Sequence, residues 1–158
     1  MFDDAELNRL FRYCRALTDS EADAFDLLQG GMERCLRTPP ADSERRIAYA
    51  MKIMSNLWRD GLRRERVVHF EPLDDEPTAL DPALEGLEAA LITRDELDHA
   101  WRELREDERE ILFLWAVEGY TLAEVAIHLD RPKGSVLSIV HRMRRRLRPE
   151  SAKEISER

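Results

Sequence analysis

The sequence predicts an all-α protein made of two small helical modules joined by an acidic linker. Apolar residues recur at three- and four-residue spacing in several segments, as on one face of a helix. No segment alternates apolar and polar residues as a strand does, and only 6 of the 158 residues are glycine. With 43% apolar residues and 37% charged residues, the chain has the composition of a charged globular protein.

The first module is predicted over residues 1–66, as three helices. The first helix runs from about Asp4 to Leu17 with the apolar stripe Leu7, Leu10, Phe11, Cys14 and Leu17. The second helix begins after Ser20, an N-cap with Asp23 three residues on. Its predicted inward face is Phe25, Leu28, Met32 and either Cys35 or Leu36. A third helix starts at Asp42 or Ser43 and reaches about Arg66, with Ile47, Ala50, Met51, Met54, Leu57 and Trp58 as its buried candidates.

Residues 67–90 are predicted to be the linker, because they hold three prolines and a dense set of acids. The second module follows over residues 91–148, and residues 149–158 form a C-terminal tail. One of its helices is expected to begin at Asp107, capped with Glu110, and to end at Gly119.

The strongest local signal is a capping box formed by Thr121 and Glu124. It opens a short helix, "DRPKGS" forms a turn, and a longer basic helix follows with the inward stripe Val136, Val140, Met143 and Leu147. A short helix, a tight turn and a longer basic helix together predict a helix-turn-helix.

Positive charge is concentrated in this last helix although the whole chain has a formal net charge of −8. The segment from Arg131 to Arg148 contains no acid and seven basic residues: Arg131, Lys133, Arg142, Arg144, Arg145, Arg146 and Arg148. Arginines near a helix C-terminus oppose the macrodipole, but so many basic residues without an acid partner exceed that need. The segment therefore predicts contact with nucleic-acid phosphates, with a solvated basic face as the alternative.

A second basic patch ends the third helix, where Trp58 is followed by Arg59, Arg63, Arg64 and Arg66. Arginine binds phosphate and an aromatic ring can stack on a base, so this patch suits single-stranded or distorted DNA. The alternative is that Trp58 belongs to the core and the arginines solvate the end of the helix.

Other function classes find little support. No stretch approaches the roughly 20 apolar residues that span a bilayer, and "MFDDAELNRL" lacks the layout of a signal peptide, so a cytoplasmic protein without membrane insertion is expected. Cys14 and Cys35 are expected to be reduced core thiols. The four histidines (His69, His99, His128, His141) lie at non-ligand spacing, and no nucleophile–base set or phosphate loop occurs. We therefore expect no enzyme activity, no metal and no cofactor.

Three segments resemble the extracytoplasmic-function (group IV) sigma factors of bacterial RNA polymerase. They are "EADAFDLLQ", "NLWRDGLRRER" and "LREDEREILFLWAVEGYTLAEVAIHLDRPKGSVLSIVHRMRRRLR". The resemblance extends from about Leu7 to Arg148 and is most specific in the last segment. It implies that the first module is sigma region 2, that the second is sigma region 4, and that the linker passes through the polymerase cleft and RNA exit path.

The resemblance also implies roles for particular residues. Residues expected to dock on the clamp helices of core RNA polymerase are Asp26, Leu27, Leu28 and Gln29. Residues expected to handle the −10 element and the melted strand are Tyr49, Asn56, Asp60, Arg63 and Arg64. Residues expected to contact the −35 element from the recognition helix are Lys133, Ser135, Val136, Ser138, Ile139, Arg142 and Arg145. The helices before this one would meet the polymerase flap.

The sequence departs from the family pattern at two places. Gly30 and Gly31 follow the "DLLQ" segment, where they could soften the helix and weaken or reshape the polymerase contact. Leu137 and Ile139 occupy recognition-helix positions that are commonly basic in the family. Aliphatic side chains contact thymine methyls but cannot recognise guanine, so −35 recognition is expected to be weak, T-rich, or dominated by phosphate and DNA shape.

Three hypotheses follow from the sequence. The first is a sigma factor without catalysis of its own, which binds core polymerase and promoter DNA and is controlled by an anti-sigma factor or another signal. The second is a sigma-like decoy or adaptor that binds a regulatory protein through Leu137 and Ile139. The third is a dimeric helix-turn-helix repressor, which leaves the first module and the linker without a function.

Overall fold

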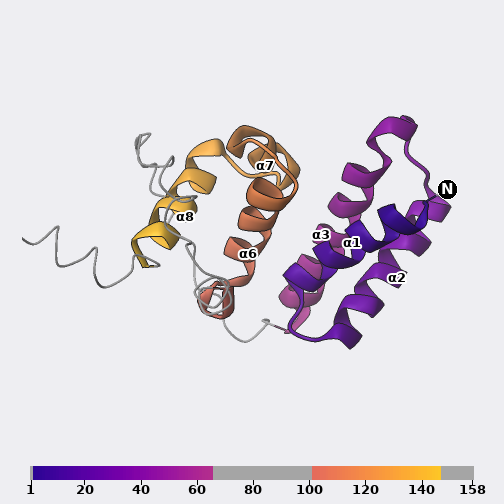
Figure 1. Cartoon of the computed structure of the whole chain (residues 1–158), viewed down its shortest axis with the longest axis horizontal. Helices are drawn as coiled ribbons and strands as arrows, with labels where there is room; N and C mark the ends of the chain where they lie inside the picture. Colours follow the sequence, from indigo (N-terminus) through magenta and orange to yellow (C-terminus); the bar gives the residue numbers. More distant parts are fainter. Residues whose placement is uncertain (1, 66–100, 147–158) are drawn as a thin grey trace, which may run out of the picture. The chain divides into compact units, whose positions relative to one another are not determined.

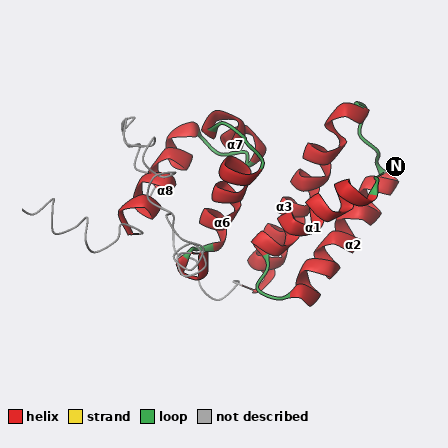
Figure 2. Ribbon diagram, viewed as in Figure 1, coloured by secondary structure: helices red, strands yellow, loops and turns green. Residues whose placement is uncertain are grey.

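The computed structural model describes residues 2–65 and 101–146. All regular secondary structure in these two ranges is helical (Figure 1). No strand occurs in these two ranges (Figure 2), which confirms the predicted all-α class. The chain divides into two compact units, Met1–Leu73 and Asp74–Arg158, and each is described by itself. The predicted linker and tail lie outside the described residues, as does Leu147.

The first unit contains three helices that all pack on one another: α1 (Asp4–Leu17), α2 (Glu21–Arg37) and α3 (Arg46–Glu65). The expected N-cap of α2 is confirmed, because the Asp23 N–H donates to Ser20 Oγ at 3.1 Å. A single 3-10 turn, Ser43–Arg45, precedes α3, and Asp42 caps this turn by accepting from the Glu44 N–H.

Small residues form the inward face of α2. Ala24, Gly31 and Cys35 are buried, so the backbone of α2 can approach α1 and α3 closely. The prediction that Phe25 faces inward is wrong, since its side chain is 52% exposed. Of the two alternatives Cys35 and Leu36, Cys35 is buried and Leu36 is 54% exposed. The remaining core of the unit comes from α1 and α3, and its fully buried side chains include Leu10, Tyr13, Cys14, Leu17, Ala50, Met51 and Met54.

Gly31 marks the closest approach between α2 and α3. A Cβ atom at this position would lie 2.6 Å from Met54 Cγ and 2.9 Å from Met54 Cε. Met54 is fully buried, with its Sδ 3.5 Å from Cys14 Sγ, so it has little room to move. The α2 helix continues through both glycines. Gly31 therefore serves the packing of the unit.

An ion pair joins the start of α1 to the start of α3. Glu6 Oε1 accepts from Arg46 Nε at 2.9 Å and lies 2.6 Å from Arg46 Nη2. Its other oxygen, Oε2, accepts from the Asp3 N–H at 2.9 Å, while Asp3 Oδ1 accepts from the Glu6 N–H at 2.8 Å. Glu6 therefore caps its own helix and binds an arginine 40 residues away in the sequence.

In the second unit, α6 (Glu106–Leu112) continues as a π-helical turn, Phe113–Val117. The Glu118 N–H donates to the Phe113 carbonyl at 3.1 Å, five residues back, as a π-helix requires. Gly119 then adopts a φ of 74°, which confirms the predicted end of the helix.

The predicted cap of α6 at Asp107 with Glu110 is wrong. The helix begins one residue earlier, after Arg105, and Glu108 Oε2 accepts from the Arg105 N–H at 2.8 Å. Glu108 stands three residues after Arg105, which is the spacing that lets a side chain reach back to the cap N–H.

The helix-turn-helix is confirmed. It consists of α7 (Leu122–His128) and α8 (Lys133–Arg146), which pack on each other. Thr121 caps α7, because its Oγ1 accepts from the Glu124 N–H at 3.1 Å. Asp130 turns the chain with a φ of 51°.

Replacing Gly31 by alanine should lower the free energy of unfolding by about 1–3 kcal/mol, the usual cost of overpacking a well-packed core. Gly30→Ala is the matched control, since its Cβ would meet Leu57 Cδ1 at 3.7 Å, an ordinary contact. Alanine is about 0.5–1 kcal/mol better than glycine in a helix, so Gly30→Ala should raise stability. Urea unfolding of the full chain, with hydrogen exchange of α2 and α3, tests both changes. Equal effects of the two substitutions would contradict the close approach at Gly31.

The stability of the first unit should depend on the ionisation of Glu6. The hydrogen bond from the Asp3 backbone, and then the one from Arg46, lower the pKa of Glu6 below its ordinary value of 4.5. Because the folded-state pKa is depressed, the contribution is complete above about 4.5 and is lost as the pH falls through the folded-state pKa. Wild type should exceed Glu6→Gln in urea midpoint at pH 7, and the difference should shrink as the pH falls through the folded-state pKa of Glu6.

Arg46→Met is the control for this pH dependence. It removes the hydrogen bond and the charge of Arg46 but leaves the largest cause of the pKa shift, the hydrogen bond from the Asp3 backbone, so part of the difference from Glu6→Gln should remain. Identical pH profiles for wild type and Glu6→Gln would show that this carboxylate contributes nothing to folding.

Candidate nucleic-acid interfaces

One face of α3 carries four of the five residues predicted to handle the −10 element. Tyr49, Asn56, Asp60 and Arg63 follow one another at intervals of seven, four and three residues, which places them on the same side of a helix. The buried residues Ala50, Met51 and Met54 lie on the opposite side. Asn56, Asp60 and Arg63 are exposed, and Tyr49 is half-buried. The fifth residue, Arg64, is exposed beside this stripe.

The same face contains a basic residue that the sequence analysis missed. Lys52 lies between Tyr49 and Asn56 at intervals of three and four residues, and its side chain is half-buried. The spacing of three and four residues between Tyr49, Lys52 and Asn56 could have identified Lys52 from the sequence alone. The α3 stripe thus alternates cationic and neutral hydrogen-bonding groups, with one acid, Asp60.

Tyr49 also has a structural contact. Its hydroxyl donates to the backbone carbonyl of Thr38 at 2.7 Å, and Thr38 is the C-cap of α2. The bond fixes one end of the connection between α2 and α3. The Asp42 cap of the following 3-10 turn orders the other end. Tyr49 therefore links the α3 stripe to the loop beside it.

The predicted polymerase-docking segment presents a mixed surface. Asp26 and Gln29 are exposed, whereas Leu27 and Leu28 are half-buried and contribute to packing. Phe25 lies next to this pair, and its ring centroid is 4.5 Å from that of Phe11 in α1. An exposed aromatic beside polar groups is typical of protein interfaces, and the sequence analysis had assigned Phe25 to the core.

The α8 helix presents fewer predicted −35 residues than expected. Lys133, Arg142 and Arg145 are exposed, and Ser135 is half-buried. The other three, Val136, Ser138 and Ile139, have buried side chains and are not on the surface. Their contact with DNA stays a prediction. The groups at the surface are those that bind phosphate and form hydrogen bonds.

Leu137 and Ile139 are also buried, with exposed fractions of 8% and 6%. The adaptor hypothesis depended on these two aliphatic side chains lying on the surface. In the structure both side chains are buried, so they do not form the exposed aliphatic surface that this hypothesis requires.

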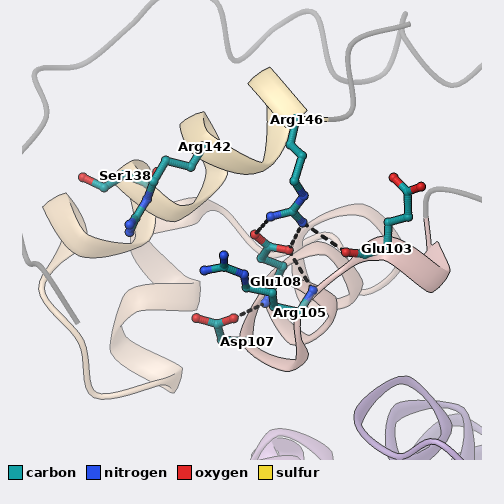
Figure 3. Close-up of polar contacts among 7 residues, drawn as sticks. All are labelled: Glu103, Arg105, Asp107, Glu108, Ser138, Arg142 and Arg146. Atoms are coloured by element: carbon teal, nitrogen blue, oxygen red, sulfur yellow. Dashed lines mark hydrogen bonds and ion pairs between the residues drawn. The ribbon is translucent and has the colours of Figure 1, made fainter. Parts of the chain in front are cut away.

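Two of the basic residues near α8 have acid partners, which corrects the interpretation of the segment as unpaired. Arg131 Nη1 lies 3.7 Å from Asp107 Oδ2. Arg146 forms a two-point ion pair with Glu108 (Figure 3), in which Nη1 donates to Oε1 at 2.9 Å and Nη2 binds Oε2. The Glu108 partner raises the pKa of Arg146, so its charge is retained. The sequence hides both pairs because their members lie far apart in the chain.

The two cysteines are buried free thiols, as expected. Burial raises the pKa of Cys14 to about 12 and raises the pKa of Cys35, which disfavours reactive thiolates. Within residues 2–65 and 101–146, no group of three or more His, Cys, Asp or Glu side chains could hold a metal ion. In the same ranges, no helix is both long enough and apolar enough to cross a membrane.

Comparison with known families gives two matches in sequence order. The family model "Sigma-70 region 2" matches residues 3–67, and "Sigma-70, region 4" matches residues 94–147. The two models together cover most of the chain, which therefore belongs to the sigma-70 family.

Two individual proteins are similar to this chain. One is the ECF RNA polymerase sigma factor SigE of Mycolicibacterium smegmatis, 29% identical over 157 residues, which cover 95% of this chain and 60% of the relative. The chain thus spans about 60% of that relative's length. The other is the sigma factor RpoE in complex with the anti-sigma factor NepR from Bartonella quintana. It matches with a TM-score of 0.60 and 21% identity over 90% of this chain and 89% of that one, which supports the fold.

The Tyr49 hydroxyl should stabilise the connection between α2 and α3. Tyr49→Phe keeps the ring but removes the donor to Thr38, so it should cost about 0.5–1.5 kcal/mol, the net value of one hydrogen bond. Hydrogen exchange of the amides in residues 38–45 should become faster. Thr38→Ala is the control, because it keeps the carbonyl that accepts the bond. If Tyr49→Phe leaves exchange in this loop unchanged, the hydroxyl does not order it.

Proposed function

We propose that this protein is a promoter-specificity subunit of bacterial RNA polymerase. It binds the clamp helices and flap of the core enzyme, contacts the −35 element through α8 and opens the −10 region through α3. The observation that carries the proposal is the polar stripe of α3 in a region 2 unit, followed in the same chain by a region 4 helix-turn-helix.

The chemistry of the described residues supports a binding function. Exposed Arg63 and Arg145 can neutralise phosphates, and exposed Asn56 can hydrogen-bond a base or sugar. We propose that the protein has no catalysis of its own, needs no cofactor, and acts in the cytoplasm, where the polymerase works. Its control by an anti-sigma factor is also a proposal. It is supported by the fold it shares with RpoE, which was solved with the anti-sigma factor NepR.

Transcription with purified core polymerase tests this function. The full chain should direct run-off transcripts from particular fragments of a genomic library, and the core enzyme alone should not. A complete absence of promoter-specific transcripts would contradict the proposal. Recovery of a small regulatory protein, with no polymerase subunit bound, would favour the adaptor alternative.

Two exposed substitutions should separate polymerase binding from promoter opening. Gln29→Ala should weaken binding to core polymerase by about 5- to 30-fold, the effect of losing 1–2 kcal/mol at an interface. Asn56→Ala should leave that affinity unchanged and should reduce open complex by about tenfold, as one lost hydrogen bond of ~1.4 kcal/mol does. Affinity measurements and permanganate footprinting provide the two readouts, and each variant is the other's control. A variant that changes both readouts equally would argue against two separate surfaces.

A further inference from the structure

Both ends of the recognition helix are tied to one turn of α6. Arg131 lies two residues before the start of α8, and Arg146 is its last residue. Their partners, Asp107 and Glu108, are neighbours in the first turn of α6. One short acidic turn therefore binds an arginine at each end of the helix that is proposed to lie on DNA.

The Glu108–Arg146 contact is the stronger of the two. The carboxylate accepts hydrogen bonds from both terminal nitrogens of the guanidinium, and Arg146 Nη2 also donates to the Glu103 carbonyl at 3.3 Å (Figure 3). The Glu108 side chain is only 4% exposed, so this charge is shielded from water. A two-point contact between planar groups fixes direction as well as distance. It thus limits rotation of α8 against α6.

The helix dipoles favour this arrangement. Glu108 lies in the first turn of α6, where the partial charge of the helix is positive, and Arg146 lies in the last turn of α8, where it is negative. Glu108 is also held by the Arg105 N–H, which leaves its carboxylate little freedom. Each group is therefore stabilised by its own helix before the two meet.

The other arginines of α8 are used differently. In Figure 3, Arg146 points toward Glu108, whereas Arg142 folds back along α8, and its Nε donates to the Ser138 carbonyl at 3.4 Å. Arg145 and Arg146 are both exposed, but Arg146 also makes the two-point contact with Glu108. Adjacent arginines of one helix thus have different surroundings, which a basic run in the sequence does not reveal.

We propose that Asp107 and Glu108 are positioning residues for promoter recognition. They hold α8 in its DNA-binding orientation and keep Arg131 and Arg146 from binding phosphate. Phosphate contacts of the helix then come from Lys133, Arg142, Arg144 and Arg145. This inference rests on the proposed function, because it assumes that α8 lies on DNA. On this proposal, some basic residues set the orientation of α8, and others supply its affinity for DNA.

Salt dependence of promoter binding separates the two groups. Each phosphate that a protein neutralises contributes about 0.9 to the slope of log affinity against log salt. Holoenzyme made from core polymerase and the full chain is titrated with a promoter fragment recovered by the transcription assay, and with a random fragment of equal length. Arg145→Met should reduce the slope by about one contact and leave the promoter-to-random affinity ratio unchanged. Arg146→Met should leave the slope unchanged and reduce that ratio about tenfold.

Glu108→Gln tests the same inference from the acidic side. It keeps the size of the side chain and an acceptor for the Arg105 N–H, but it no longer holds the arginine by charge. Released Arg146 should then bind phosphate. The salt dependence of affinity should therefore become steeper by about one contact, while the promoter-to-random affinity ratio falls. In Glu108→Gln/Arg146→Met the slope should return to the wild-type value. A loss of stability alone would not raise the slope in one variant and restore it in the other.

Circular dichroism and urea unfolding of each full-length variant show whether it is folded. Should Arg146→Met fail to fold, Arg146→Lys replaces it, because it keeps the charge but loses the two-point geometry. A fall in slope for Arg146→Met equal to that for Arg145→Met would overturn the inference and leave the proposed function intact. If no variant changes the slope or the affinity ratio, α8 does not lie on DNA, and both are overturned.

Discussion

A glutamate at the third position of a helix organises each unit of this protein. In the first unit, Glu6 accepts from the Asp3 N–H and binds Arg46 at the start of α3. In the second, Glu108 accepts from the Arg105 N–H and binds Arg146 at the end of α8. Each glutamate thus accepts from a backbone N–H that the N-terminus of its own helix leaves unsatisfied. It also binds an arginine of a second helix, 40 residues away in the first unit and 38 in the second. Small helical units bury a limited fraction of their apolar surface, so directional contacts of this kind help to fix how their helices pack.

Much of the fold could be predicted because its signals are local. The limits of α1, the Ser20 cap, the Thr121 cap and the end of the helix before Gly119 all follow from residues a few positions apart. The inward face of α2 could not be predicted in the same way. A periodic pattern favours large apolar residues in the core, whereas the close approach of α3 selects the small face that includes Gly31.

The candidate interfaces could be predicted in part for a related reason. The spacing from Tyr49 to Arg63 places the predicted −10 residues on one side of α3, because residues at these intervals share one side of any helix. Whether a basic residue near α8 is paired with an acid depends instead on Asp107 and Glu108, which no local sequence pattern connects to it. The burial of Ile139 likewise reflects packing that periodicity does not specify. Charge in a sequence indicates a type of partner, but contacts decide which charges are available to bind it.

The π-helical turn Phe113–Val117 affects how this chain should be aligned with related proteins. Such a turn behaves as a single residue inserted into an α-helix, and one residue corresponds to roughly 100° of helical rotation. A homologue that lacks one residue here could keep α6 and the helix-turn-helix in register with an unbroken α-helix between them. A one-residue gap at this point would then mark a change of helix type, with the flanking cores conserved. An alignment that moves the gap elsewhere would pair core positions with surface positions.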